Sequence, residues 1–372
     1  MTYKTVFRSK FLVVALILLI LLTSCKEKES TEIKDIENLT LYSVRRWSKY
    51  GYIDNKGNII IKPQFDFALD FSEGLAAVKK DNKMGYINKK GEIVIEPKFE
   101  WTGAFKEGIA PIDITIDPYM RSTLTGFIDR EGNVLKEPTY KYTSVFHEGL
   151  CSVSTSGGKY GYIDKNFDMV IPEQFSSTMN FKEGLAAVKY EEGGNWGYID
   201  KTGELVIKDK FVAAGYFNEG LAPVQVKDTS TGGYHWGYIN KEGEFVIKPK
   251  YGGAVYFSEG LGGVGVRDDK GYCKYGFIDK EGKTVIEPIY KDVTCFQEGL
   301  AAVLVETREG TVFSEAEYKW GYINKSGEMV IEPKFDDVRE FIDGVAIVRV
   351  GEQPWWKEGY IDKTGKFIWG PK

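Results

Sequence analysis

Residues 196–220 read Trp-Gly-Tyr-Ile-Asp-Lys-Thr-Gly-Glu-Leu-Val-Ile-Lys-Asp-Lys-Phe-Val-Ala-Ala-Gly-Tyr-Phe-Asn-Glu-Gly, and variants of this stretch fill most of the chain. Counted from the first Gly of the stretch, the pattern begins nine times at spacings of 34 to 45 residues. The nine glycines are Gly51, Gly85, Gly126, Gly161, Gly197, Gly237, Gly276, Gly321 and Gly359. Self-similarity at a nearly constant period predicts a repeat architecture.

Several offsets from that Gly hold one residue type in every copy. Position +1 is Tyr or Phe, +2 is Ile and +3 is Asp or Asn. Three short apolar segments in each copy predict three strands. The Asp/Asn-Lys-x-Gly segment between the second and third predicts a type I turn within a hairpin. Because Asp and Asn interchange at +3, as at Asp54 and Asn88, we interpret this side chain as a turn cap rather than a metal ligand or general base.

Two further positions constrain the connection between copies. Position +23 is Gly in all eight complete copies, for example Gly220, and predicts a positive φ or close pressure from a neighbouring strand. Position +25 is always small, for example Ala222, and predicts contact with a neighbouring aromatic ring. Both faces of the Trp-Gly-Tyr-Ile strand are apolar, so each unit must be covered on both sides by its neighbours.

The resulting expectation for the fold is an all-β tandem array of nine three-stranded antiparallel units over residues 39–372. An open superhelical stack is the favoured arrangement, because nine blades exceed the usual size of a propeller. A closed propeller-like ring is the alternative.

The N-terminus has the composition of an export signal. Lys4, Arg8 and Lys10 precede an apolar run, 11–22, that is too short for a confident membrane-spanning helix. Leu-Thr-Ser-Cys follows at 22–25 and resembles a bacterial lipobox. We therefore predict a lipoprotein signal peptide over 1–25, with Cys25 as the acylated mature N-terminus, and a flexible tether over 26–38. An ordinary signal peptide and a signal anchor are the alternatives.

The repeat resembles the WG-repeat family of bacterial proteins. Trp196-Gly197, Trp236-Gly237 and Trp320-Gly321 carry the defining pair literally, and the resemblance covers roughly residues 41–371. It implies an exported or surface bacterial protein of unclear biochemical role. It supplies no catalytic residues.

Composition excludes several classes of function. The formal net charge is −5 and the pI is near 5.5, which argues against nucleic-acid binding. With only two histidines, and no P-loop, dinucleotide fingerprint or Gly-x-Ser-x-Gly elbow, we expect no metal site, no cofactor and no enzymatic activity. A carboxylate recurs at +22 in each complete copy, for example Glu148, and is interpreted as stabilising a turn because one carboxylate per copy is too few to bind calcium.

Three cysteines follow Cys25. Cys151 takes the small +25 position and is expected to be a packed, inert thiol. Cys273 and Cys295 belong to one copy, and a disulfide between them is left open.

Specificity is expected where the copies differ, because residues shared by all copies are explained by folding. The segments between Val +27 and the next Gly vary most, and several carry aromatics. The candidate ligand contacts are Tyr119, Tyr234, His235, Tyr272, Trp355 and Trp356. Exposed loop aromatics favour recognition, although local hydrophobic cover, and for the two tryptophans a cap on the terminal unit, are the alternatives.

The sequence thus predicts a lipid-anchored protein of the bacterial cell envelope whose repeats form a binding or interaction scaffold. Its partners would be the membrane, through the N-terminal lipid, and a glycan or a protein. A structural spacer without a specific ligand is the alternative, and a carbohydrate-active enzyme a remote one.

Overall fold

The computed structural model describes residues 36–117, 122–230, 232–310, 315–351 and 355–371. The chain divides into two compact units, the first comprising residues up to 54 and 58–98, the second residues 55–57 and 99–372. Cys25 and Tyr119 lie outside the described residues. Within those residues, no helix is long and apolar enough to cross a membrane.

The first unit begins with a short 3-10 helix, η1 (Ile36–Asn38), where the sequence predicted the end of a tether. Two sheets follow, ordered β1-β2-β3 and β4-β5-β6-β7. Their strands are β1 (Tyr42–Arg46), β2 (Lys49–Ile53), β3 (Ile59–Phe65), β4 (Phe67–Ala68), β5 (Leu75–Lys80), β6 (Lys83–Asn88) and β7 (Ile93–Phe99).

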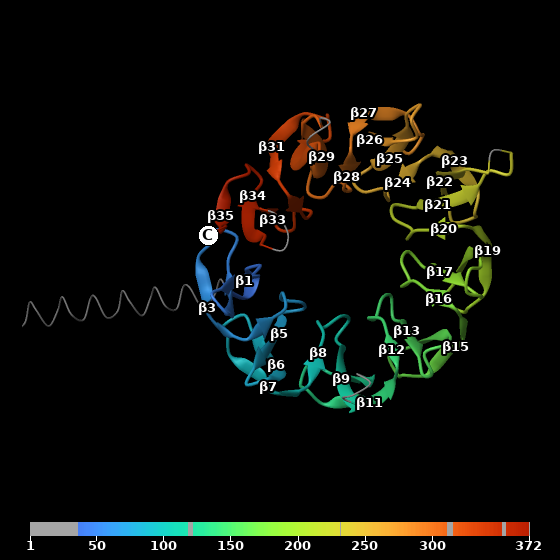
Figure 1. The fold of residues 1–372 in the computed structure, drawn as a ribbon. Coiled ribbons are helices and arrows are strands. Elements are labelled where there is room, and N and C mark those ends of the chain that lie inside the picture. Colours follow the sequence, from blue (N-terminus) through green and yellow to red (C-terminus); the bar gives the residue numbers. More distant parts are fainter. Residues whose placement is uncertain (1–35, 118–121, 231, 311–314, 352–354, 372) are drawn as a thin grey trace, which may run out of the picture. The chain divides into compact units, whose positions relative to one another are not determined.

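The second unit holds seven four-stranded antiparallel sheets, in each of which spatial order follows chain order. The first four sheets contain β8 (Trp101–Thr102), β9 (Ala110–Asp117), β10 (Ser122–Ile128), β11 (Val134–Tyr140); β12 (Tyr142–Thr143), β13 (Cys151–Ser154), β14 (Tyr160–Ile163), β15 (Met169–Phe175); β16 (Ser177–Thr178), β17 (Ala186–Lys189), β18 (Trp196–Ile199), β19 (Leu205–Phe211); and β20 (Ala213–Ala214), β21 (Ala222–Lys227), β22 (Tyr234–Ile239), β23 (Phe245–Tyr251). The last three contain β24 (Gly253–Ala254), β25 (Gly262–Arg267), β26 (Cys273–Ile278), β27 (Thr284–Tyr290); β28 (Asp292–Val293), β29 (Leu300–Arg308), β30 (Glu317–Asn324), β31 (Met329–Phe335); and β32 (Asp337–Val338), β33 (Val345–Val350), β34 (Lys357–Asp362), β35 (Phe367–Trp369). Figure 1 shows these sheets as a curved row with the two-residue first strands on its inner side.

The predicted tandem array of nine all-β repeats is confirmed, but the number of strands per sheet was wrong. Eight of the nine sheets carry a fourth, two-residue strand, such as β16. Such a strand has no apolar alternation, so the sequence pattern gives no sign of it. The last strand of each repeat tolerates the Pro at +12, as in β31 with Pro333, because it lies at the edge of its sheet.

The hydrophobic core lies between successive sheets, as the two-sided apolar pattern predicts. Leu185 and Tyr198 of one sheet pack with Ala222 and Ile239 of the next. Tyr198 also donates a hydrogen bond of 2.8 Å to the carbonyl oxygen of Gly215, which follows β20. The equivalent hydrogen bond is made by Tyr52, Tyr162, Tyr238 and Tyr322, whereas Phe127 and Phe277 pack at the same position without a hydroxyl.

Backbone geometry explains the invariant glycines. At Gly197 an added Cβ would lie 2.7 Å from the carbonyl oxygen of Ile207, where the β18–β19 register shifts. Gly220 instead has a φ of 83° with nothing within 4 Å of an added Cβ, so the first of the two predicted reasons, a positive φ, applies. Glu219 before it has a φ of 52°, and together they form the kind of two-residue turn that requires two left-handed residues.

Candidate functional site

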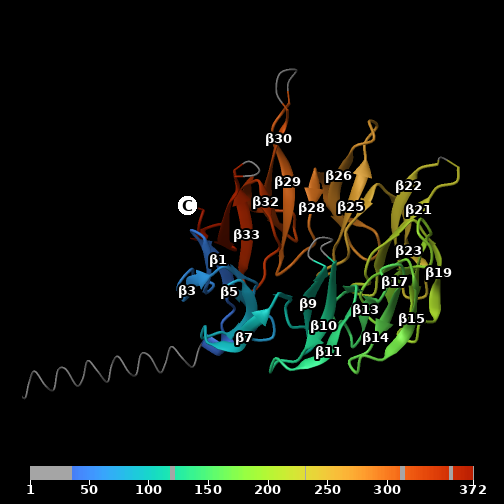
Figure 2. The ribbon, with the colours of Figure 1, turned by 60° about the horizontal axis from the view of Figure 1, so that its bottom comes forward.

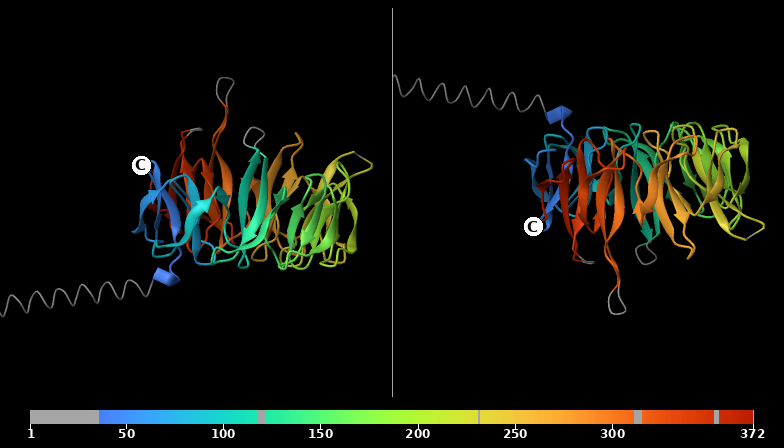
Figure 3. Two further views of the ribbon diagram at one scale, coloured as in Figure 1. Left: turned by 90° about the horizontal axis from the view of Figure 1, so that it is seen from below. Right: turned by 90° about the horizontal axis from the view of Figure 1, so that it is seen from above.

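The strand order gives each four-stranded sheet of the second unit two different edges. The loop between its second and third strands lies at one end of the strands, and we call this end of the sheet the insert edge. The Glu-Gly turn and the Asp/Asn-Lys-x-Gly turn lie at the opposite end of the strands, which we call the turn edge. Figures 2 and 3 show long hairpins, among them β29–β30, projecting from the insert edge.

At the turn edge, the recurring +22 carboxylate joins each sheet to the next. The Glu148 carboxylate lies 3.1 Å from the Lys201 ammonium and accepts a 3.0 Å hydrogen bond from the backbone N–H of Gly184. Both partners belong to the following sheet. The same ion pair recurs in Glu107–Lys165, Glu183–Lys241, Glu219–Lys280, Glu259–Lys325 and Glu298–Lys363, at 2.9 to 3.3 Å.

These contacts shift the acidity of the carboxylates. Partial burial acts to raise the pKa of Glu148, but Lys201 and the Gly184 N–H outweigh it, so the pKa lies below its usual range. The pKa values of Glu107, Glu219 and Glu298 are lowered in the same way. The interpretation of this column as structural is supported, but these contacts join each carboxylate to the following sheet rather than to its own turn.

The +3 side chains cap their turns as predicted. The Asn88 side-chain oxygen accepts hydrogen bonds from the backbone N–H groups of Lys90 and Glu92, both at 3.0 Å. Asp129 makes the equivalent contacts with Glu131 and Asn133. An amide and a carboxylate thus do the same work, which explains why they interchange.

The insert edge holds the described candidate ligand contacts. Tyr234 and Tyr272 are 42% and 60% exposed, on neighbouring hairpins. Each has a basic side chain beside it, since the Arg267 guanidinium donates to the Tyr234 carbonyl oxygen at 3.4 Å and the Lys291 ammonium lies 5.5 Å from the Tyr272 ring centroid. The Asp268 carboxylate also accepts a 2.9 Å hydrogen bond from the Tyr272 N–H. The half-buried His235 has a buried Nδ1 that finds no hydrogen-bond partner among the described residues.

The two adjacent tryptophans of the last insert divide their roles. The Arg349 guanidinium lies 5.1 Å from the ring centroid of Trp356, which is half-buried. Trp355 is 84% exposed. One ring therefore packs on its own chain while its neighbour faces solvent, as the alternation of side chains along an extended segment allows.

A second group of side chains was missed by the sequence reasoning. It flanks the invariant Phe at +20 and follows the first strand of each sheet. The Cys295 thiol donates to the Tyr256 hydroxyl at 3.2 Å, and the Lys182 ammonium lies 5.6 Å from the Tyr256 ring centroid. The contact with Cys295, together with burial, raises the pKa of Tyr256. The signal was available, because +19 and +21 differ among copies that share Phe at +20.

The remaining cysteines and histidine also have defined surroundings. Cys151 is fully buried, and burial raises the pKa of its thiol to about 12, so the prediction of a packed thiol is confirmed. Cys273 and Cys295 are both free, which answers the open question of a disulfide. His147 is half-buried, and burial lowers its pKa. In the part of the chain that the structure describes, no three His, Cys, Asp or Glu side chains are grouped to hold a metal ion.

Fold and repeats together define a class of protein, a tandem array of small antiparallel β-sheets joined by recurrent clamps. A profile described as WG containing repeat matches residues 50–83, 84–114, 126–160, 160–193, 196–229, 236–269, 275–306 and 320–353. The chain belongs to this family.

Other comparisons bear on the fold alone. No curated protein matches the chain. Among solved structures, one titled "Crystal structure of the eukaryotic initiation factor" is 10% identical and superposes with a TM-score of 0.61, covering 88% of this chain and 95% of the other. The BamB structure from Moraxella catarrhalis is also 10% identical, with a TM-score of 0.45 and coverage of 83% and 96%.

Proposed function

We propose that this chain is an exported binding scaffold, anchored through acylated Cys25 in a bacterial cell envelope, whose insert edge recognises a glycan or a protein. The observation that carries the proposal is that structural residues and exposed aromatic residues occupy different positions of the repeat. Residues shared by the copies are used in turns, clamps and core. Exposed aromatics on long hairpins vary among copies and gather at the insert edge of the second unit.

The chemistry of that edge suits recognition. Tyr234, Tyr272 and Trp355 offer flat apolar rings to a partner at small conformational cost, and Arg267 and Lys291 supply donors beside two of them. We propose no catalytic role, because the recurring carboxylates of the second unit are held in ion pairs between sheets.

The test is capture of partners from the native cell envelope, with glycan-array binding of the same chain. We expect Tyr272→Ala and Trp355→Ala each to reduce binding at least fivefold without changing the melting temperature. The matched control is Tyr216→Ala, because Tyr216 is 38% exposed but lies between β20 and the Glu219-Gly220 turn, at the turn edge. Saturable capture that ignores all three substitutions would place recognition elsewhere, and no capture at all would favour a structural spacer.

A further inference from the structure

A strained and exposed tryptophan stands at the tip of the first hairpin of the first unit. Trp47 is 90% exposed and has a φ of 64°. It is the first residue of the two-residue loop that connects the paired residues Arg46 and Lys49. That position of a hairpin turn needs a positive φ and is therefore usually Gly, whereas a bulky residue with a positive φ is rare.

The neighbouring hairpin shows that this choice is not imposed by the fold. There the β5–β6 loop holds Asp81 and Asn82, with φ values of 50° and 64°. Asp and Asn are residue types that tolerate the left-handed region. The positive φ of Trp47 is therefore a strained conformation that the burial of its ring does not offset within this chain. We infer that the ring is buried by a partner outside the described residues.

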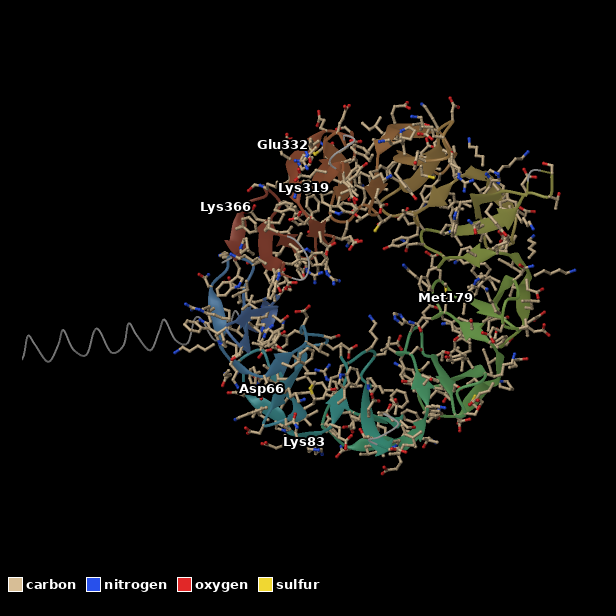
Figure 4. The ribbon with its side chains drawn as sticks, in the orientation of Figure 1. Asp66, Lys83, Met179, Lys319, Glu332 and Lys366 are labelled. Carbon is tan, nitrogen blue, oxygen red and sulfur yellow. The ribbon has the colours of Figure 1, made fainter. Side chains whose placement is uncertain are left out.

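The surroundings of Trp47 are strongly basic. Arg45, Arg46 and Lys49 flank it, and Lys79, Lys80 and Lys83 belong to the neighbouring tip. Asp66 brings the two tips together, because its carboxylate lies 2.5 Å from the Lys49 ammonium and also feels the charge of Lys79. Asp66 and Lys83 are labelled in Figure 4. The two tips thus carry six basic residues and only two acidic ones, Asp66 and Asp81, although the net charge of the chain is −5.

The shape of this tip indicates which kind of anionic partner it suits. Sites for small ligands are concave and enclose their ligand, whereas the Trp47 ring projects at a hairpin tip with 90% of its surface exposed. A projecting aromatic ring surrounded by Arg and Lys is suited to the boundary of an anionic bilayer, where the ring enters the headgroup region and the cations meet phosphates.

We propose that the basic tip, comprising residues 45–49 and 79–83, docks on an anionic phospholipid surface with Trp47 inserted at the interface. The segment between Cys25 and Ile36 is long enough for the basic tip to reach the bilayer that holds the anchor. Eleven residue steps separate Cys25 from Ile36 and span at most about 36–40 Å, whereas the five residues of β1 span about 17 Å. That step rests on the acylation of Cys25 proposed above, while the affinity of the tip for an anionic bilayer does not.

The test uses the full chain with vesicles of phosphatidylcholine alone or with a quarter of phosphatidylglycerol, both containing brominated acyl chains. The anchor is common to every arm, so lipid composition tests the tip. We expect quenching of Trp47, measured as the difference between wild type and Trp47→Phe, on anionic vesicles only, with loss in 1 M salt. Trp355→Phe is the matched control and should leave this quenching unchanged, because Trp355 is similarly exposed at a different tip.

Charge variants complete the test. Arg45→Ser with Arg46→Ser should weaken occupancy of the interface by roughly tenfold or more. Lys208→Ser with Lys248→Ser, the same charge change at exposed sites on β19 and β23, should not. Equal quenching on neutral vesicles, or no difference between wild type and Trp47→Phe, would overturn the proposal. So would binding of soluble dextran sulfate without any binding to anionic vesicles, because the partner would then be an anionic polymer. Trp47→Gly should melt no lower than wild type, and a fall of several degrees would show that the ring packs on its own chain.

Discussion

The Glu148 carboxylate lies 3.1 Å from the Lys201 ammonium of the following sheet, and the pairing is repeated along the second unit. Both side chains are partly exposed, so the ion pair alone contributes up to about 1 kcal/mol. The charged hydrogen bond from the Gly184 N–H adds to it. The clamp is thus weak at each interface and works through repetition.

Glu148→Ala is expected to lower the free energy of unfolding by about 1–2 kcal/mol, since it removes both the ion pair and the acceptor for Gly184. A double-mutant cycle with Lys201→Ala, followed by urea denaturation, should give a coupling energy of about 0.5–1 kcal/mol. Glu192→Ala is the control, because Glu192 is an exposed acid in an insert. Zero coupling between Glu148 and Lys201 would refute the clamp.

The clamps predict a loss of stability in acid. The folded-state pKa values of Glu107, Glu148, Glu219 and Glu298 lie below the ordinary value of 4.5. A depressed pKa means that the unfolded chain binds protons first, so the stabilisation is present above about pH 4.5 and is lost as pH falls through the lower folded values. The urea midpoint should therefore drop between pH 5 and pH 3. Glu148→Gln with Glu219→Gln should make that drop shallower, and an unchanged slope would contradict the assignment.

The Glu-Gly turn predicts a penalty for any side chain at +23. Gly220→Ala forces a φ of 83° on a residue with a Cβ and should cost about 1–2 kcal/mol. Gly158 is the matched control, since its φ is not positive and the nearest atom to an added Cβ is the Ser156 hydroxyl oxygen at 3.9 Å. Gly158→Ala should be neutral or slightly stabilising, and an equal loss at both sites would make the turn assignment wrong.

Offsets that recur within the chain predicted local structure well. They indicated the three longer strands, the oxygen caps at Asn88 and Asp129, and the positive φ at Gly220, because each depends on neighbours close in sequence. The partner of Glu148 was missed although basic residues recur at +4, since Lys201 lies 53 residues away and adjacency arises only when sheets stack. Tyr256 and Cys295 both occupy position +19, which differs among copies. That variation marked +19 as a place for specific contacts but did not identify which residues would meet.

The turn between β2 and β3 provides a further test of a backbone contact. Residues 55–57 group with the second unit, where an added Cβ on Gly57 would lie 2.0 Å from the carbonyl oxygen of Ile368 in β35. Gly57→Ala should therefore destabilise the chain more than Gly91→Ala. Gly91 has nearly the same φ, 81° against 83°, but an added Cβ there meets only the Ile61 side chain at 3.2 Å. Equal melting temperatures for the two variants would contradict this contact of Gly57 with the Ile368 backbone.

The adjacent tryptophans of the last insert should separate stability from recognition. Trp356 is half-buried beneath the Arg349 guanidinium, so Trp356→Ala should cost about 1–2 kcal/mol through lost packing and cation–π attraction. That is less than the about 3–5 kcal/mol expected for a tryptophan buried in a core, because this ring lies outside the buried clusters. Trp355, at 84% exposure, should tolerate Ala within about 0.5 kcal/mol.

If Trp355 is a recognition residue, Trp355→Ala should lose binding to the captured partner while Trp355→Tyr retains most of it, since Tyr keeps a ring for stacking. Thermal denaturation and partner binding measured on the same samples decide the matter. A loss of stability at Trp355 comparable with that at Trp356 would show that both rings cap the terminal sheet, and recognition would then lie with Tyr234 and Tyr272.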